Sequence, residues 1–205
     1  MSKIFGNKEY FALEYNLPYF NLGYDISSII GILKLWVNGI DLCLFEKDNK
    51  NYGYEWTIYY IVEWLCEKQQ YILGYDPFPL PVKGDNVLEL IYNANTYNND
   101  DKCEFDLWYF AKSRWIFNHC WFSSRDGGII PSVYFRRNSK IIEISWDNIF
   151  WEEYGINFCS KKGVYYLPYF EFRKVIHEFL NSIITDLEGM VQTEKLANLK
   201  NKLLF

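Results

Sequence analysis

Hydrophobic and polar residues alternate with a period of two in several segments of the chain. This pattern predicts a half-buried strand at 9–17 and a β-hairpin that joins 29–37 to 40–46. The hairpin turn is Asn38-Gly39, a dipeptide that tolerates the positive φ angles of a type I′ turn. The polar run that follows, KDNKNYG, contains nothing that could be buried, so we expect a loop there.

A second hairpin is predicted from SVYFRR and IIEISW, with its turn at Asn138-Ser139. Side chains alternate between the two faces of a strand. The first strand therefore divides into Val133, Phe135 and Arg137 on one face and Tyr134 and Arg136 on the other. A further short strand, VYYL, is expected at 164–167.

Hydrophobic residues at three- and four-residue spacing predict the helices. These are expected at 55–71, 86–94, 104–122 and 168–188, with a final amphipathic helix at 193–205. The third is aromatic around so much of its circumference that we expect it at the centre of the core. Pro77, Pro79 and Pro81 favour an extended connection, and the polar segment 93–102 predicts a mobile loop or an internal boundary.

These elements indicate an α+β fold, in which antiparallel β-hairpins pack against aromatic-rich α-helices and the C-terminus is helical. A chain of 205 residues with 50% hydrophobic residues can bury a full core, so we expect a single domain over 1–205. Its C-terminal helical portion, 168–205, ends on apolar residues and is a candidate docking appendage.

Composition limits the partners. A net charge of −5 argues against general nucleic-acid binding, which needs a basic surface. Aromatic residues make up 20% of the chain, more than a core of this size needs, and rings left at the surface mark a contact with a protein or ligand. No apolar run approaches the length of about 20 residues that a membrane span needs, and the first residues lack a secretory signal, so we expect a cytoplasmic protein.

The cysteines predict no disulfide framework and no zinc site, because their number is odd and no two are closely spaced. They are Cys43, Cys66, Cys103, Cys120 and Cys159, and we interpret them as buried free thiols. His177-Glu178 begins like a zinc-peptidase motif, but Asn181 stands where the second histidine is required. We therefore predict no metal and no cofactor.

One enzymatic hypothesis remains. Metal-dependent nucleases hold Mg²⁺ between two carboxylates and place a lysine nearby, and Asp126 with Glu143 has part of this arrangement. Ser145 occupies the position of the lysine, so Lys140 would have to replace it from the turn.

Arginines are concentrated around the glycine-rich loop that precedes the second hairpin. Arg125, Arg136 and Arg137, with Arg114 on the preceding helix, could form a site for a small anionic ligand or a carboxylate. The alternative is structural, because charged residues on the two faces of an edge hairpin prevent unwanted strand pairing. In that case Glu143 forms an ordinary cross-strand pair with an arginine.

The same region resembles an accessory module that precedes the peptidase domain in some bacterial ImmA/IrrE-type metallopeptidase proteins. The resemblance rests on His119, Gly127, Gly128, Pro131, Phe135, Arg136, Arg137, Glu143, Ile144, Ser145 and Trp146, and extends to the LKLWVNGIDL hairpin. The HExxH peptidase motif is absent, so the resemblance implies a stand-alone recognition or regulatory module, of the sort expected in bacterial stress or phage-defence loci, and no catalytic residue.

Three functions follow as hypotheses. The first is a non-enzymatic recognition module that binds a protein through the 125–137 region and through exposed aromatic residues such as Trp146 and Trp151; the second is the metal-dependent nuclease, and the third a sensor of nucleotide-type ligands. The residues proposed for binding are Arg114, His119, Arg125, Asp126, Gly127, Gly128, Arg136, Arg137, Glu143 and Trp146.

Overall fold

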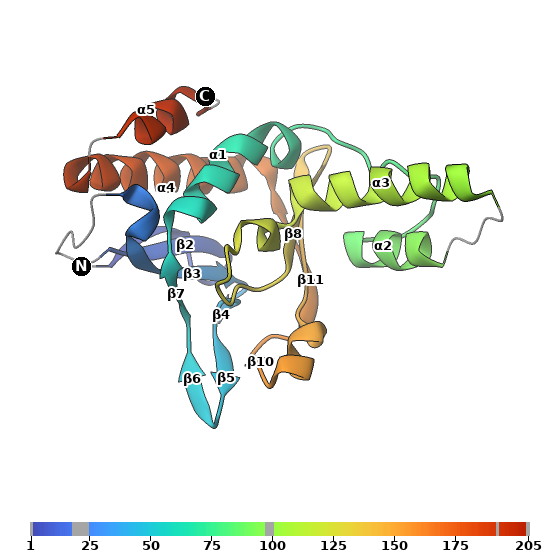
Figure 1. The fold of residues 1–205 in the computed structure, drawn as a ribbon, viewed down its shortest axis with the longest axis horizontal. Coiled ribbons are helices and arrows are strands. Elements are labelled where there is room, and N and C mark those ends of the chain that lie inside the picture. The colour runs from blue at the N-terminus through green and yellow to red at the C-terminus, as the bar shows by residue number, and fades with distance from the viewer. Residues whose placement is uncertain (1, 18–24, 97–100, 192, 204–205) are drawn as a thin grey trace.

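The computed structural model describes residues 2–17, 25–96, 101–191 and 193–203, and Figure 1 shows their arrangement. In chain order the elements are β1 (Lys3–Asn7), β2 (Phe11–Asn16), η1 (Ile26–Ser28), β3 (Ile30–Val37), β4 (Ile40–Asp41), β5 (Phe45–Lys47), β6 (Lys50–Tyr52), β7 (Tyr54–Thr57), α1 (Tyr59–Ile72), α2 (Val87–Asn95), α3 (Lys102–His119), η2 (Trp121–Ser124), β8 (Val133–Asn138), β9 (Ile141–Asp147), η3 (Ile149–Tyr154), β10 (Asn157–Phe158), β11 (Lys162–Pro168), α4 (Tyr169–Met190) and α5 (Glu194–Asn201). The expected α+β class, with antiparallel sheets and a helical C-terminus, is confirmed.

The first sheet runs β1-β2-β3, and β4 and β7 both pair with the far edge of β3. The β3–β4 turn has φ angles of 51° at Asn38 and 77° at Gly39, as the predicted hairpin requires. One face of this sheet is buried beneath α4, where Phe11 packs on Phe172 and Tyr15 packs on Phe179. The alternation in β2 and β3 therefore identified the buried face correctly.

The second sheet that contributes to the core, β11-β9-β8, contains the second predicted hairpin, with its turn at Ser139-Lys140 and not at the predicted Asn138-Ser139. Its buried face carries Phe135, Ile142 and Ile144, all within the same hydrophobic cluster as the first sheet. Phe135 contacts Trp64 of α1 and Phe172 of α4, so these two helices join the sheets into one core.

Helix α4 and the short helix α5 add residues from Phe172 to Leu199 to this core. Residues 168–205 are thus packed on the body over their described part, and their use in docking stays a prediction. The helix expected at 168–188 continues through Gly189 to Met190.

The KDNKNYG segment was predicted as a loop, and this is wrong. Strands β5 and β6 form a hairpin there, turning at Asp48 and Asn49 with φ angles of 52° and 59°. Asn and Asp adopt such angles more readily than other side-chain-bearing residues, and β6 is exposed along its length, so no alternation revealed the strand. Strand β10 completes this third sheet, which projects from the body (Figure 1).

Two other segments differ from expectation because pairing between distant strands decides their conformation. Strand β1 pairs with β2 but is largely exposed, so no pattern predicted it. The helix expected from Glu55 begins at Tyr59, since Tyr54–Thr57 form β7 against the edge of β3. The expected strand 40–46 is divided into β4 and β5.

Helix α3 was predicted to lie at the centre of the core, and this is wrong. Only Trp115, Asn118 and His119, near its C-terminal end, are buried. The rest of the helix extends away from the sheets, with α2 beneath it (Figure 1). Two hydrogen bonds join the helices, one from Trp108 to the Ala94 carbonyl and one from Lys112 to the Asn95 side chain. We call α2 and α3 together the arm.

In the part of the chain that the structure describes, none of the helices combines the length and the hydropathy that crossing a membrane requires.

Candidate functional site

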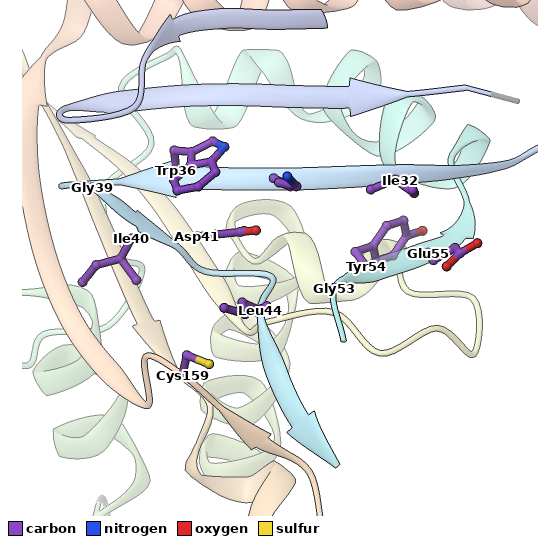
Figure 2. Close-up of a pocket in the computed structure, with 11 residues that line it drawn as sticks. Ile32, Trp36, Gly39, Ile40, Asp41, Leu44, Gly53, Tyr54, Glu55 and Cys159 are labelled. Atoms are coloured by element: carbon purple, nitrogen blue, oxygen red, sulfur yellow. The ribbon is translucent and has the colours of Figure 1, made fainter. Parts of the chain in front are cut away.

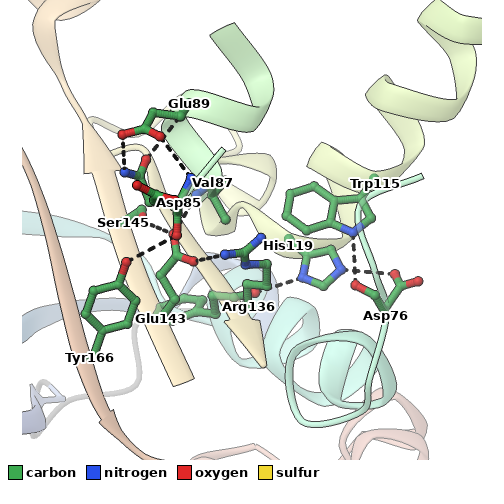
Figure 3. Close-up of polar contacts among 12 residues, drawn as sticks. Asp76, Asp85, Val87, Glu89, Trp115, His119, Arg136, Glu143, Ser145 and Tyr166 are labelled. Carbon is green, nitrogen blue, oxygen red and sulfur yellow. Dashed lines mark hydrogen bonds and ion pairs between the residues drawn. The ribbon is translucent and has the colours of Figure 1, made fainter. Parts of the chain in front are cut away.

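A buried polar network lies on the face of the β11-β9-β8 sheet that is opposite the core (Figure 3). Glu143, at its centre, is fully buried. It faces Arg136 in the strand register, and Arg136 Nη2 lies 2.5 Å from its Oε2. The predicted cross-strand pair is therefore present, although its burial makes it quite unlike a surface pair.

The other carboxylate oxygen of Glu143 accepts hydrogen bonds from the backbone N–H of Val87, at 2.6 Å, and from the Ser145 hydroxyl. Val87 is the first residue of α2, and Asn86 caps the same helix by accepting from the Glu89 N–H. Glu143 thus occupies the position at a helix N-terminus that favours an anion. The network attaches α2 to the sheet.

His119 anchors α3 in a similar way. Its Nδ1 lies 2.7 Å from the Phe135 carbonyl oxygen, its Nε2 lies 3.0 Å from Asp76 Oδ2, and its ring stacks on Trp115 at 3.9 Å. Burial lowers the pKa of His119, and the nearby Arg136 charge acts in the same direction, against the opposing effect of Asp76 and the Phe135 carbonyl. The histidine joins α3, the 76–78 connection and strand β8.

The four arginines do not converge on one site. Arg136 pairs with Glu143, whereas Arg137 is on the other face, where it donates to the Leu73 carbonyl and stacks on Tyr169 at 3.8 Å. Arg125 stacks on the ring of Phe122 at 4.3 Å. Arg114 is exposed on α3. The structural alternative describes Arg136 and Arg137 better than an anion site does.

The 125–128 loop lies against β7. Trp56 donates to the carbonyl oxygen of Asp126 at 3.0 Å, and the ring of the same tryptophan packs on Gly128. Asp126 and Gly127 have φ angles of 40° and 83°, so the glycine relieves strain in this turn. The two glycines line a hollow of about 470 Å³ together with residues of β5–β7.

Asp126 and Glu143 lie in different surroundings: Asp126 borders α1 and β7, whereas Glu143 lies beneath α2. Within the described residues, no three histidine, cysteine, aspartate or glutamate side chains lie close enough to hold a metal ion. Trp146, expected at the surface, is 6% exposed, and its indole N–H donates to Ser160 Oγ at 2.9 Å.

Cysteine exposure also differs from expectation. Cys43, Cys66 and Cys120 are buried, and burial raises the pKa of the last to about 11. Cys103 and Cys159 are exposed. Neither lies in the core because α3 and the residues after β10 face solvent.

A groove that the sequence did not reveal lies at the edge of β3, where β4 and β7 diverge (Figure 2). Its volume is about 560 Å³, and its lining includes Trp36, Ile40 and Leu44, with Cys159 at its border. Residues on alternate positions of β3 face it, so the period-two pattern did contain a signal that this face is not covered by a helix.

Two carboxylates near this groove are perturbed in opposite directions. Burial raises the pKa of Asp41 to about 6, although its side chain accepts from the Cys43 N–H at 3.0 Å. Burial also acts to raise the pKa of Glu14, but hydrogen bonds from Lys8, Ser2 and Trp36 and the charge of Lys34 outweigh it and lower this pKa to about 2. Both carboxylates thus form polar contacts between their own strand and β3.

Among the described helices, α3 carries the largest group of exposed apolar side chains. Leu107 is 72% exposed, Phe110 64% and Phe117 53%. The sequence analysis missed this surface because aromatic residues on every side of a helix were interpreted as a sign of burial.

Comparisons of the chain with protein-family models, curated proteins and solved structures give no match, so the function is argued from the geometry.

Proposed function

We propose that this protein is a recognition module that acts by binding another protein chain through the arm, and not by catalysis. The observation that carries the proposal is the exposure of Leu107, Phe110 and Phe117 on a helix that projects from the body. Leu107 and Phe110, three residues apart, are neighbours on the helix surface. Apolar side chains that are grouped in this way and left exposed usually mark a contact with a partner.

The arm is held firmly enough to present such a surface. Trp115 and His119 fix its base, through hydrogen bonds to the carbonyl oxygen of Asp76 and to the Phe135 carbonyl respectively. The buried pair of Glu143 with Arg136 fixes the start of α2, which supports the distal half of α3. A surface that is ordered before binding loses less entropy on association.

The polar residues that suggested chemistry are engaged within the fold. Glu143 forms an ion pair with Arg136 and accepts hydrogen bonds from the Val87 N–H and the Ser145 hydroxyl. Arg137 donates a hydrogen bond to the Leu73 carbonyl and stacks on the ring of Tyr169. The nuclease alternative would need Glu143 and Asp126 on one metal ion, and their separate surroundings do not favour it. The resemblance to the accessory module supports a setting in bacterial stress or phage defence, which is part of the proposal.

Site-specific photo-crosslinking in cells that express the protein would test this. A photoreactive phenylalanine analogue replaces Phe110 in the arm, and in a matched control it replaces Phe170, which is 67% exposed on the body. We expect a protein adduct, identified by mass spectrometry, at the first position and none at the second. Equal labelling at both positions, or no adduct at Phe110, would overturn the proposal.

A second candidate function is binding of a small apolar molecule in the groove beside β3, whose volume lies in the range of ligand pockets. Among the described residues that line the groove, the basic side chain is Lys34, which already pairs with Glu14 at 3.4 Å, so an apolar ligand is favoured over a nucleotide. Thermal-shift assays with indole and with mononucleotides, repeated on Leu44→Asp, would test it. Stabilisation by indole that the variant loses is expected; no shift with indole, or a shift retained by the variant, would contradict it.

A further inference from the structure

The exposed face of α3 has the spacing of a coiled-coil seam. Its residues follow one another at alternating intervals of four and three, the repeat at which one helix packs along another. They are Cys103, Leu107, Phe110, Arg114 and Phe117, all of them exposed. We call these five residues the seam.

The opposite side of α3 is already occupied. Trp108 and Trp115 face α2 and the 76–78 connection, through a hydrogen bond to the Ala94 carbonyl and a ring contact with Phe78 at 5.1 Å. The seam is therefore on a different side of α3 from α2, and only its last residue, Phe117, lies beside α1. An additional helix could pack on it without displacing α2.

Charge is distributed unevenly along the helix. Its N-terminal part, 101–110, has three carboxylates and one lysine, whereas 111–119 has two basic residues and no carboxylate. Lys68 of α1 adds a further positive charge at the same end, 4.5 Å from the ring centre of Phe117. Two copies of α3 in antiparallel orientation would place the acidic part of each beside the basic part of the other.

We infer that the occupant of the seam is a second copy of this chain, paired through α3 in antiparallel orientation. The inference rests on the proposed function, since it names the partner of the same surface. Near the two-fold axis, Leu107 and Phe110 of the two copies would interdigitate. Asp106, which flanks the seam, would lie near Arg114 of the other copy. A parallel pair would instead place like charges together.

Sedimentation equilibrium of the purified full chain is the first test. We expect a mass of twice 24.7 kDa at micromolar concentration. Combined Leu107→Glu and Phe110→Glu substitutions should raise the dimer dissociation constant about 100-fold or more, because they charge the centre of the contact. Both side chains are exposed in the single chain, so the variant should keep the circular dichroism spectrum of the wild type. Phe105→Glu, an exposed position of α3 outside the seam, is the matched control.

Charge exchange tests the orientation. Asp106→Arg and Arg114→Asp should each weaken the dimer about tenfold, and the two together should restore it, because the opposite charges meet again. If the double variant is weaker than either single variant, the antiparallel arrangement is wrong.

Cysteine crosslinking tests the orientation independently. In a Cys159→Ser background, the native Cys103 should form crosslinks through a short bismaleimide with Arg114→Cys. It should form none with Cys103 of the other copy when it is the only exposed thiol, since the two would lie at opposite ends of the pair. Crosslinking of Cys103 to itself would indicate a parallel pair and overturn the inference.

These results separate the inference from the proposed function. A monomer in sedimentation together with a photo-adduct between Phe110 and a different protein would refute the second copy and keep the recognition function. A monomer with no adduct would refute both.

Discussion

Removal of the charge that compensates Glu143 should destabilise the protein strongly. Arg136→Met keeps an unbranched side chain of similar aliphatic length but removes the guanidinium group, which leaves a fully buried carboxylate without its cation. Breaking a buried ion pair from one side costs about 3–5 kcal/mol. Nε of Arg136 is buried without a hydrogen-bond partner among the described residues, and the pair depends on one close Nη2–Oε2 contact, which favours the lower end, about 3 kcal/mol. Such a loss is a large part of the stability of an ordinary domain.

Replacement of both partners should cost less than removal of the arginine alone. With Arg136→Met and Glu143→Met together no charge is left buried, and the main remaining penalty is the Val87 N–H, which loses its acceptor. An unsatisfied buried donor costs about 1–3 kcal/mol. The double variant should therefore be more stable than Arg136→Met, and the two single substitutions should be strongly non-additive.

Urea unfolding followed by tryptophan fluorescence and by circular dichroism measures these free energies. Lys174→Met is the matched control, because Lys174 pairs with Glu178 at 3.9 Å on the exposed face of α4, where a pair contributes less than about 0.5 kcal/mol. A cost below about 1 kcal/mol for Arg136→Met, or additive single substitutions, would refute the account of the network as a buried pair that holds α2 on the sheet.

Other substitutions test the pH dependence and the packing. The pKa of Glu14 in the folded state, about 2, lies below the ordinary glutamate value of 4.5, so its contribution to stability is present above pH 4.5 and is lost as the pH falls toward 2. Glu14→Gln should flatten this part of a stability profile measured by urea unfolding. Gly163→Ala should cost about 1–3 kcal/mol because the added methyl group meets the ring of Trp146, and an unchanged unfolding midpoint would contradict this. Gly189→Ala, in a helix with open space around the site, should stabilise the protein by about 0.5–1 kcal/mol in the same assay; a loss of stability would show that the helical glycine has another role.

Local sequence determined most of the secondary structure. The turn at Asn38-Gly39 and the alternation in β3 depend on backbone preferences and on burial of one face, which neighbouring residues already express. The sequence also predicted that Glu143 pairs with an arginine across the second hairpin, but the turn lies at Ser139-Lys140, one residue beyond the predicted Asn138-Ser139, and this register places Glu143 opposite Arg136.

Tertiary structure decided which surfaces are covered, and a single chain segment does not contain that information. Helical periodicity predicted α3, but its aromatic residues do not reveal how many neighbouring elements cover the helix. In the structure α2 covers one side of it, and only residues near its C-terminal end are buried. Glu143 is buried because α2, from a segment more than fifty residues away, places its N-terminus over that face of the sheet. The groove beside β3 exists because β4 and β7 share one edge and then diverge. Hydrophobic pattern specifies that a residue can be buried, whereas the packing of distant elements determines whether it is.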